Sequence, residues 1–191
     1  LLAQVIFETP SSLTSIGDDA FSECKALTNI TFPSSIKSIG EEAFFKCCLL
    51  TDISISSSLT TIGERAFNEI EKLNITGNIN IILDRMFAKS YYLTEITIPP
   101  SVTSIGDSAF YGCGNLEKIT FVPISSLISI GEKAFYECKL LEQITIPSSV
   151  TSIGNFSFYG CESLKQVIFE TPSSLTSIEE NVFTGCKSLT Q

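Results

Sequence analysis

The chain has 191 residues, of which 43% are hydrophobic, and its 12 basic and 21 acidic residues give a net charge of -9. This composition supports a buried core, but it lacks the basic stripe of a nucleic-acid-binding protein, so no nucleic-acid partner is expected. The chain contains no His, which excludes histidine-based acid–base catalysis, Ser-His and Cys-His nucleophile pairs and His-ligated zinc.

Nor does any apolar run approach the roughly 20 residues of a membrane-spanning helix, so no membrane insertion by this segment is expected. No glycine-rich phosphate loop is present, and no carboxylate pair stands out from the surrounding pattern. The sequence therefore predicts neither an enzyme nor a cofactor-binding protein.

A phrase of thirteen residues, QVIFETPSSLTSI, occupies residues 4–16 and returns unchanged at residues 166–178. Between them, a shorter motif shows that both belong to one repeating unit. Its copies, in chain order, are IGDDAF from Ile16, IGEEAF from Ile39, IGERAF from Ile62, ILDRMF from Ile82, IGDSAF from Ile105, IGEKAF from Ile130, IGNFSF from Ile153 and IEENVF from Ile178.

The Phe residues that close these motifs fall at positions 21, 44, 67, 87, 110, 135, 158 and 183, with spacings of 23, 23, 20, 23, 25, 23 and 25. A period of this size is typical of a solenoid, in which each unit covers the apolar face of the next. We therefore predict one domain over residues 1–191, with about eight repeats of 23–25 residues and one short repeat of 20.

Each unit opens with alternating apolar and polar residues, as in LTNITF, LTEITI and LEQITI, which is typical of a half-buried strand. Pro33, Pro99 and Pro147 end the strand, because proline cannot donate to a ladder. The glycine that follows permits a turn, and segments such as DDAFSEC predict about one turn of helix with Ala, Phe and Cys facing inward. The stacked Phe residues would form the core.

The unit between Phe67 and Phe87 departs from the pattern, since it is shorter and carries Leu83 and Met86 in place of Gly and Ala. Two registers are compatible with its sequence. In the first, Ile70, Leu73 and Ile75 all lie in the strand; in the second, the strand begins at Leu73. Either register predicts an irregular unit in which Met86 fills space left by the shorter loop.

The phrase S-[LV]-T-S-I-G-x-x-A-F-x-x-C, repeated at 23 residues, resembles the BspA-type (treponemal-class) leucine-rich repeat over the whole chain. The resemblance implies an α/β fold: a curved right-handed solenoid with a concave parallel β-sheet and short helices or loops on the convex side. Proteins of this family are similar to surface-displayed and secreted adhesins.

The resemblance thus implies a protein–protein interaction module, extracellular or at the cell surface, that binds host or matrix proteins without a cofactor. A structural spacer with no ligand of its own is the alternative. Neither end of the chain shows a polar cap, so we expect a fragment of a longer array that self-associates through uncapped ends.

Six of the seven cysteines lie three residues after a repeat Phe: Cys24, Cys47, Cys113, Cys138, Cys161 and Cys186. This register predicts reduced cysteines that pack as small hydrophobic residues. An occasional disulfide between neighbouring repeats, or a reactive Cys48, is the alternative.

An acidic column follows the turn glycine, with Asn155 as the exception: Asp18, Glu41, Glu64, Asp84, Asp107, Glu132 and Glu180. A row of carboxylates suggests calcium, but Asp and Glu also favour the first turn of a helix. The second interpretation agrees with the predicted helices, so no metal site is predicted.

Two surfaces are candidates for binding. Because inward and outward residues alternate along a strand, the concave face is predicted to present Gln4, Asn29, Thr31, Asp52, Ser54, Glu95, Thr97, Lys118, Thr120, Gln143, Thr145 and Gln166. A convex aromatic stripe is predicted from Tyr92, Tyr111, Tyr136 and Tyr159. For each surface the alternative is structural: a solvated sheet face, or rings that cover the core.

Overall fold

The described residues of this computed structural model are 2–122 and 124–190, and they form two stacks of parallel strands. The longer strands are β2 (Asn29–Thr31), β4 (Asp52–Ser54), β6 (Lys72–Thr76), β8 (Glu95–Ile98), β10 (Lys118–Phe121), β12 (Gln143–Ile146) and β14 (Gln166–Phe169). The two-residue strands are β1 (Ser15–Ile16), β3 (Ser38–Ile39), β5 (Thr61–Ile62), β7 (Ile81–Ile82), β9 (Ser104–Ile105), β11 (Ser129–Ile130) and β13 (Ser152–Ile153).

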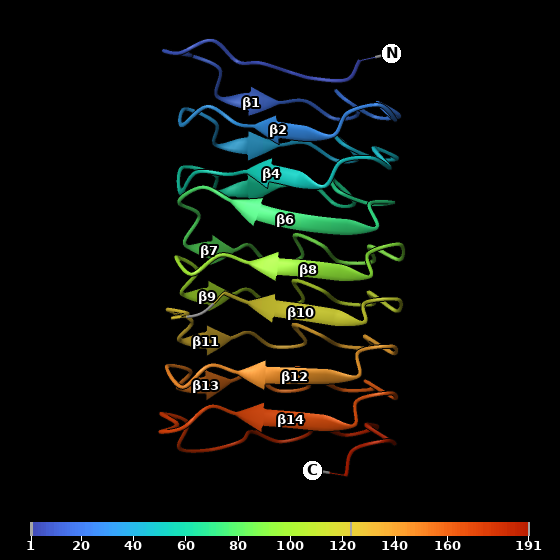
Figure 1. The fold of residues 1–191 in the computed structure, drawn as a ribbon, viewed down its shortest axis with the longest axis vertical. Helices are drawn as coiled ribbons and strands as arrows, with labels where there is room; N and C mark the ends of the chain where they lie inside the picture. The colour runs from blue at the N-terminus through green and yellow to red at the C-terminus, as the bar shows by residue number, and fades with distance from the viewer. Residues whose placement is uncertain (1, 123, 191) are drawn as a thin grey trace.

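The chain therefore winds as a solenoid, and each repeating unit contributes one turn of it, which we call a rung (Figure 1). The longer strands pair in the orders β2-β4-β6-β8-β10 and β12-β14, and we call this surface the long-strand face. The short strands pair in the orders β1-β3-β5 and β7-β9-β11-β13. The predicted parallel sheet is confirmed, while the second stack, built from Ser-Ile and similar pairs, was not predicted.

The core is the predicted column of phenylalanines, stacked ring on ring. Successive rings from Phe21 to Phe67 and from Phe87 to Phe183 lie 5.1–5.5 Å apart, centroid to centroid, in nearly parallel planes. The six inner rings are buried, and each contributes about 1.5–3 kcal/mol to the free energy of folding. Phe21 and Phe183, at the two ends of the column, are partly exposed.

The predicted short helices are wrong, because no helix occurs among residues 2–122 and 124–190. In each rung the second residue after the turn glycine takes a positive φ, as in Asp19 (54°) and Lys133 (55°), which interrupts a right-handed helix. Instead of bonding within a helix, amides in most of these turns donate to the following rung, for example Asp19 N–H to Glu41 O (2.9 Å) and Phe21 N–H to Ala43 O (2.8 Å). The turns are thus stabilised between rungs.

The turn glycines are required by close approach of the preceding rung rather than by an unusual backbone angle. A β-carbon on Gly63 would lie 2.2 Å from the Glu41 nitrogen, and one on Gly131 would lie 2.6 Å from an Asp107 carboxylate oxygen. Leu83 and Glu179 occupy the equivalent position without glycine, and there the short-strand stack is interrupted: β5 does not pair with β7, and β13 has no partner after it among the described residues. Glycine therefore sets how closely two rungs approach.

The short repeat is accommodated by a change of register within β6. Ile75 pairs with Ile53 of the preceding rung, whereas Leu73 pairs with Ile96 of the following rung. Ile70 is buried outside the strand, three residues after Phe67, at the position that Cys occupies in most other rungs. The strand thus begins at Lys72, close to the second of the two registers left open by the sequence.

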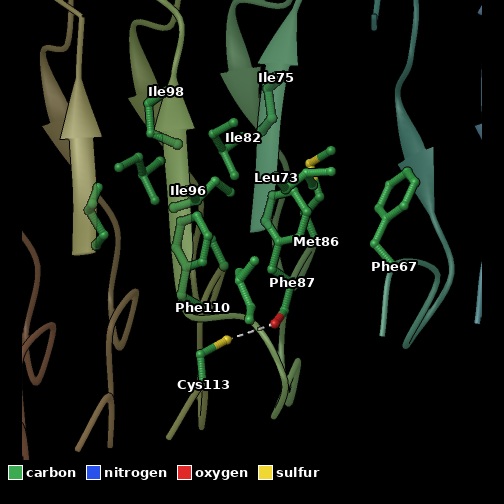
Figure 2. Close-up of a cluster of buried hydrophobic side chains, with 14 of the residues drawn as sticks. Phe67, Leu73, Ile75, Ile82, Met86, Phe87, Ile96, Ile98, Phe110 and Cys113 are labelled. Atoms are coloured by element: carbon green, nitrogen blue, oxygen red, sulfur yellow. Dashed lines mark hydrogen bonds between the residues drawn. The ribbon is translucent and has the colours of Figure 1, made fainter. Parts of the chain in front are cut away.

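Met86 lies buried among Leu73 and Phe87 in this irregular rung (Figure 2). The Phe67 and Phe87 rings are farther apart than other pairs, at 6.0 Å, and are tilted by 34°. Among the described residues, no backbone hydrogen bond joins residues 65–69 to residues 84–88, although the corresponding segments of most other neighbouring rungs are joined. The junction after Phe67 is therefore held mainly through β6.

We predict that Gly63→Ala destabilises the protein by about 1–3 kcal/mol, because the new methyl group would overlap the backbone of the rung before it. Gly17→Ala is the matched control, since nothing lies within 4 Å of a β-carbon there. Chemical denaturation followed by circular dichroism measures both changes. Equal losses of stability in the two variants would contradict the close-approach explanation.

Candidate functional site

The residues predicted for the concave face all lie on the long-strand face, with side chains exposed or half-exposed. Eleven of the twelve belong to the long strands, and Gln4 precedes the bridge between Val5 and Ile30. Pairing aligns them across rungs, as with Asn29 beside Asp52, Glu95 beside Lys118 and Gln143 beside Gln166. The alternation of the sequence therefore identified the side chains that point outward from the long strands, while a binding role for this face stays a prediction.

Three residues of this surface, all on β6, were missed: Lys72, Asn74 and Thr76. The ammonium of Lys72 lies 3.1 Å from a Glu95 carboxylate oxygen, and the Asn74 side-chain amide donates to Asp52 at 3.0 Å. The hydrogen bond and charge of Glu95 raise the pKa of Lys72. Only the register of β6 assigns them to this face, and the sequence left that register open.

The long-strand face is interrupted between β10 and β12, which form no strand pair. In Figure 1 the arrows of these two strands stand farther apart than those of β12 and β14. A cavity of about 920 Å³ opens here, which we call the sheet opening. Its walls include five residues predicted for the concave face: Glu95, Lys118, Thr120, Gln143 and Thr145.

The loop after β10 accounts for the position of the sheet opening. Residues from Phe121 to Leu127 form a connection that is two residues longer than the connection from Ile98 to Val102, and it contributes Val122, Ile124 and Ser125 to the walls. Ile124 is 94% exposed and has a φ of 66°. The longer repeat therefore coincides with a break in the sheet and with an exposed apolar side chain.

The sheet opening is acidic. Four carboxylates line it, from Glu95, Glu117, Glu142 and Glu170, against a single lysine, Lys118. Lys165 lies 2.8 Å from Glu142, and Glu170 accepts a hydrogen bond from the Ser148 amide at 3.2 Å. Glu117, Glu142 and Glu170 were missed because they stand just outside the alternating strand positions. The surface is suited to a partner that carries positive charge.

The column cysteines are reduced and form a ladder of their own. Thiol groups donate to the Phe carbonyl one rung earlier, for example from Cys113 to Phe87 at 2.9 Å (Figure 2) and from Cys161 to Phe135 at 3.2 Å. Burial raises the pKa of Cys47 and of Cys113 to about 12. Cys48 alone is exposed. The packing role is therefore confirmed for Cys47, Cys113, Cys138 and Cys161, whose buried thiols are poor nucleophiles. Cys24 and Cys186 are half-buried, and a hydrogen bond with Cys161 lowers the pKa of Cys186.

The acidic column also has a structural role, although the predicted helix is not its cause. Carboxylates of the shorter Asp residues accept a backbone hydrogen bond from the next rung: Asp18 from Glu41, Asp84 from Asp107, and Asp107 from Glu132, each at 2.8 Å.

Within residues 2–122 and 124–190, no group of three or more metal-binding side chains is placed to hold an ion. Likewise, no helix among them is long and apolar enough to span a membrane.

Three tyrosines of the predicted convex stripe form a stacked ladder, which we call the tyrosine ladder. The Tyr111 and Tyr136 rings lie 4.9 Å apart, and Tyr136 and Tyr159 are again 4.9 Å apart, with planes inclined by 8° and 9°. Removal of water from around Tyr136 raises the pKa of its hydroxyl. Tyr92 lies outside the ladder and is 56% exposed. Each ladder residue follows a core Phe, so the rings are spaced by the rungs.

We predict that rapid reaction of the native protein with a disulfide reagent at pH 8 is confined to the exposed Cys48 and the half-buried Cys24 and Cys186. Cys47, Cys113, Cys138 and Cys161 are buried, and their thiols should react only after unfolding. Stopped-flow absorbance with and without denaturant counts the two classes, and Cys48→Ser should remove one thiol from the rapid phase. Rapid reaction of the buried column in the native protein would contradict the packing role.

Comparisons with known proteins agree with this architecture. The profile of the BspA type leucine-rich repeat region matches residues 4–117 and 103–191. No curated protein matches the chain. A leucine-rich cell surface protein from Faecalibacterium prausnitzii is 30% identical, with a TM-score of 0.55 over 95% of this chain and 57% of its own length.

The leucine-rich repeat protein of T. pallidum is 25% identical, with a TM-score of 0.49 over 85% of this chain and 78% of its own. The chain spans a little more than half of the length of the Faecalibacterium protein described above. Since the family profile covers nearly the whole sequence, the chain belongs to the BspA-type leucine-rich repeat family.

Proposed function

We propose that the chain is the recognition part of a cell-surface or secreted adhesin, and that it binds host or matrix proteins through the long-strand face. The observation that carries this proposal is the acidic sheet opening, which gathers five of the predicted face residues around a cavity of about 920 Å³. Family membership supports an interaction module, and the Faecalibacterium relative is described as a cell surface protein.

The chemistry of the opening favours an extended partner segment with basic side chains. Glu117 and Glu142 stand at the starts of β10 and β12, while Ile119, Phe121 and Pro147 add apolar surface to the same walls. Carboxylates at the rim would attract the positive segment, and the apolar surface would bury its aliphatic parts. The strands themselves already position these groups, so little of the site has to be ordered on binding.

A structural spacer is the second candidate, and the uniform part of the long-strand face favours it. Outside the opening that face carries mainly hydroxyl, amide and isolated charged side chains, such as Asn29, Thr31 and Ser54. It lacks the Trp, Tyr and Arg anchors that dominate many interfaces. A spacer would bind no partner through this surface.

We predict that Glu117→Lys combined with Glu142→Lys weakens binding at least about tenfold, because it replaces attraction at the rim by repulsion. Immobilised matrix proteins, such as fibronectin, laminin and collagen, serve as the panel, and surface plasmon resonance measures the affinities. The matched control is Glu41→Lys combined with Glu180→Lys, which makes the same change in net charge at exposed positions of the acidic column.

Undiminished binding by the rim variant would exclude the sheet opening as the site. Failure of the unmodified chain to bind any protein of the panel would favour the spacer.

A further inference from the structure

A second cavity, of about 410 Å³, lies beside the tyrosine ladder, among the turn segments that follow the short strands. It is lined by Tyr111 and by Ala88, and both residues directly follow a core Phe. Neighbouring rungs place them side by side, since the Lys89 amide donates to the Tyr111 carbonyl at 2.7 Å. We call this the basic cavity.

The tyrosine ladder ends at this cavity. Tyr111 stacks on Tyr136, and among the described residues no ring contacts its other face. Ala88 occupies the position from which a further aromatic side chain would continue the ladder. With rungs that hold rings 4.9 Å apart, the space above Ala88 is where another planar ring would stack on Tyr111.

The charge of the cavity is opposite to that of the chain. Four of the 12 basic residues line it, from Arg65, Arg85, Lys89 and Lys133, against one carboxylate, that of Glu64, although the whole chain has a net charge of -9. Such a concentration of cations in an acidic protein creates a local site for an anion.

The ion pairs around the cavity leave part of this charge available. Arg85 lies 3.9 Å from Glu64, with both side chains 69% exposed, and pairs of this kind contribute little. Lys89 has no ion pair among the described residues. Arg65 is paired with Glu42, and Lys133 lies 2.6 Å from Glu132. Arg85 and Lys89 are therefore the cations most readily offered to a ligand.

The short repeat explains why the cavity exists. It places Arg65 and Arg85 on neighbouring rungs that lack the backbone bonds found between most others, at the junction where the Phe67 and Phe87 rings are tilted. The same rung supplies Ala88 where the next three rungs carry Tyr. Two independent departures from the repeat, in length and in side chain, thus meet at one place.

We propose that the basic cavity binds a planar aromatic ring carrying an anionic group. The ring stacks on the free face of Tyr111 above Ala88, and the anion is held by Arg85 and Lys89. Arginine suits this role because its planar guanidinium binds oxyanions through two parallel hydrogen bonds. The ligand is either a free aromatic acid or a sulfated tyrosine of a partner protein. The site is separate from the sheet opening and does not depend on the function proposed for it.

Calorimetric titration of the 191-residue chain with two probes tests the proposal: 4-hydroxyphenylacetate for the free acid, and N-acetyl-O-sulfotyrosine amide for the modified residue. Acetate supplies the anion without the ring, and N-acetyltyrosine amide supplies the ring without the anion. We expect at least one aromatic anion to bind at least about tenfold more tightly than both controls. The tighter of the two probes identifies the source of the ligand.

Variants locate the site. Ala88→Phe should abolish binding, because the new side chain fills the place of the ligand ring. Thr184→Phe is the matched control, since Thr184 occupies the equivalent position beyond Tyr159, at the other end of the ladder. Arg85→Gln combined with Lys89→Gln changes only exposed side chains and should weaken binding at least about tenfold, which provides a second test if Ala88→Phe perturbs folding.

Equal affinity for acetate or for N-acetyltyrosine amide would overturn the proposal, because the ring or the charge would then have no role. Absence of binding by both aromatic anions, or full affinity in the doubly substituted variant, would overturn it as well.

Discussion

Every inner rung of this solenoid is covered by the rungs on either side, and the close approach between rungs is the constraint on which the structure depends. Phenylalanine rings stacked 5.1–5.5 Å apart supply the buried surface. Backbone amides that would otherwise close a helix donate to the following rung instead, as Phe110 does to Ala134 at 2.7 Å. Glycine at the turn, thiols that reach the preceding carbonyl, and Asp carboxylates that cap the next amide all follow from this spacing.

Much of the fold could be predicted from the sequence because the stacking of the rungs appears in it as a motif that recurs at a nearly constant interval. The column of phenylalanines, the parallel strands and the outward residues all follow from the repeat and from alternation. The turns could not be predicted in the same way, since residues such as Asp19 and Lys133 adopt a positive φ and donate their amide hydrogens to the following rung. Local propensity favours a helix there, and contacts between rungs override it.

The repeated phrase shows the same limit. Residues 166–169 form β14 beside β12, whereas the identical residues 4–7 contribute only a bridge between Val5 and Ile30. Conversely, Ser15 and Ile16 form β1, but the same pair at 177–178 forms no strand, and Glu179 follows it in place of Gly17. Both candidate sites likewise lie where the period fails: the sheet opening beside a longer repeat, and the basic cavity at the shorter one. Their residues could be read from the sequence, but their grouping could not.

The junction after Phe67 is joined unequally on its two sides. Strand β6 bridges the rungs through pairing with β4 and β8, while β5 does not pair with β7 and the turn segments share no backbone hydrogen bond among the described residues. Rungs that are joined by backbone hydrogen bonds along one side alone can bend about that side. Under mechanical load we therefore expect the molecule to bend about β6, with a stiffer segment on either side of the short repeat.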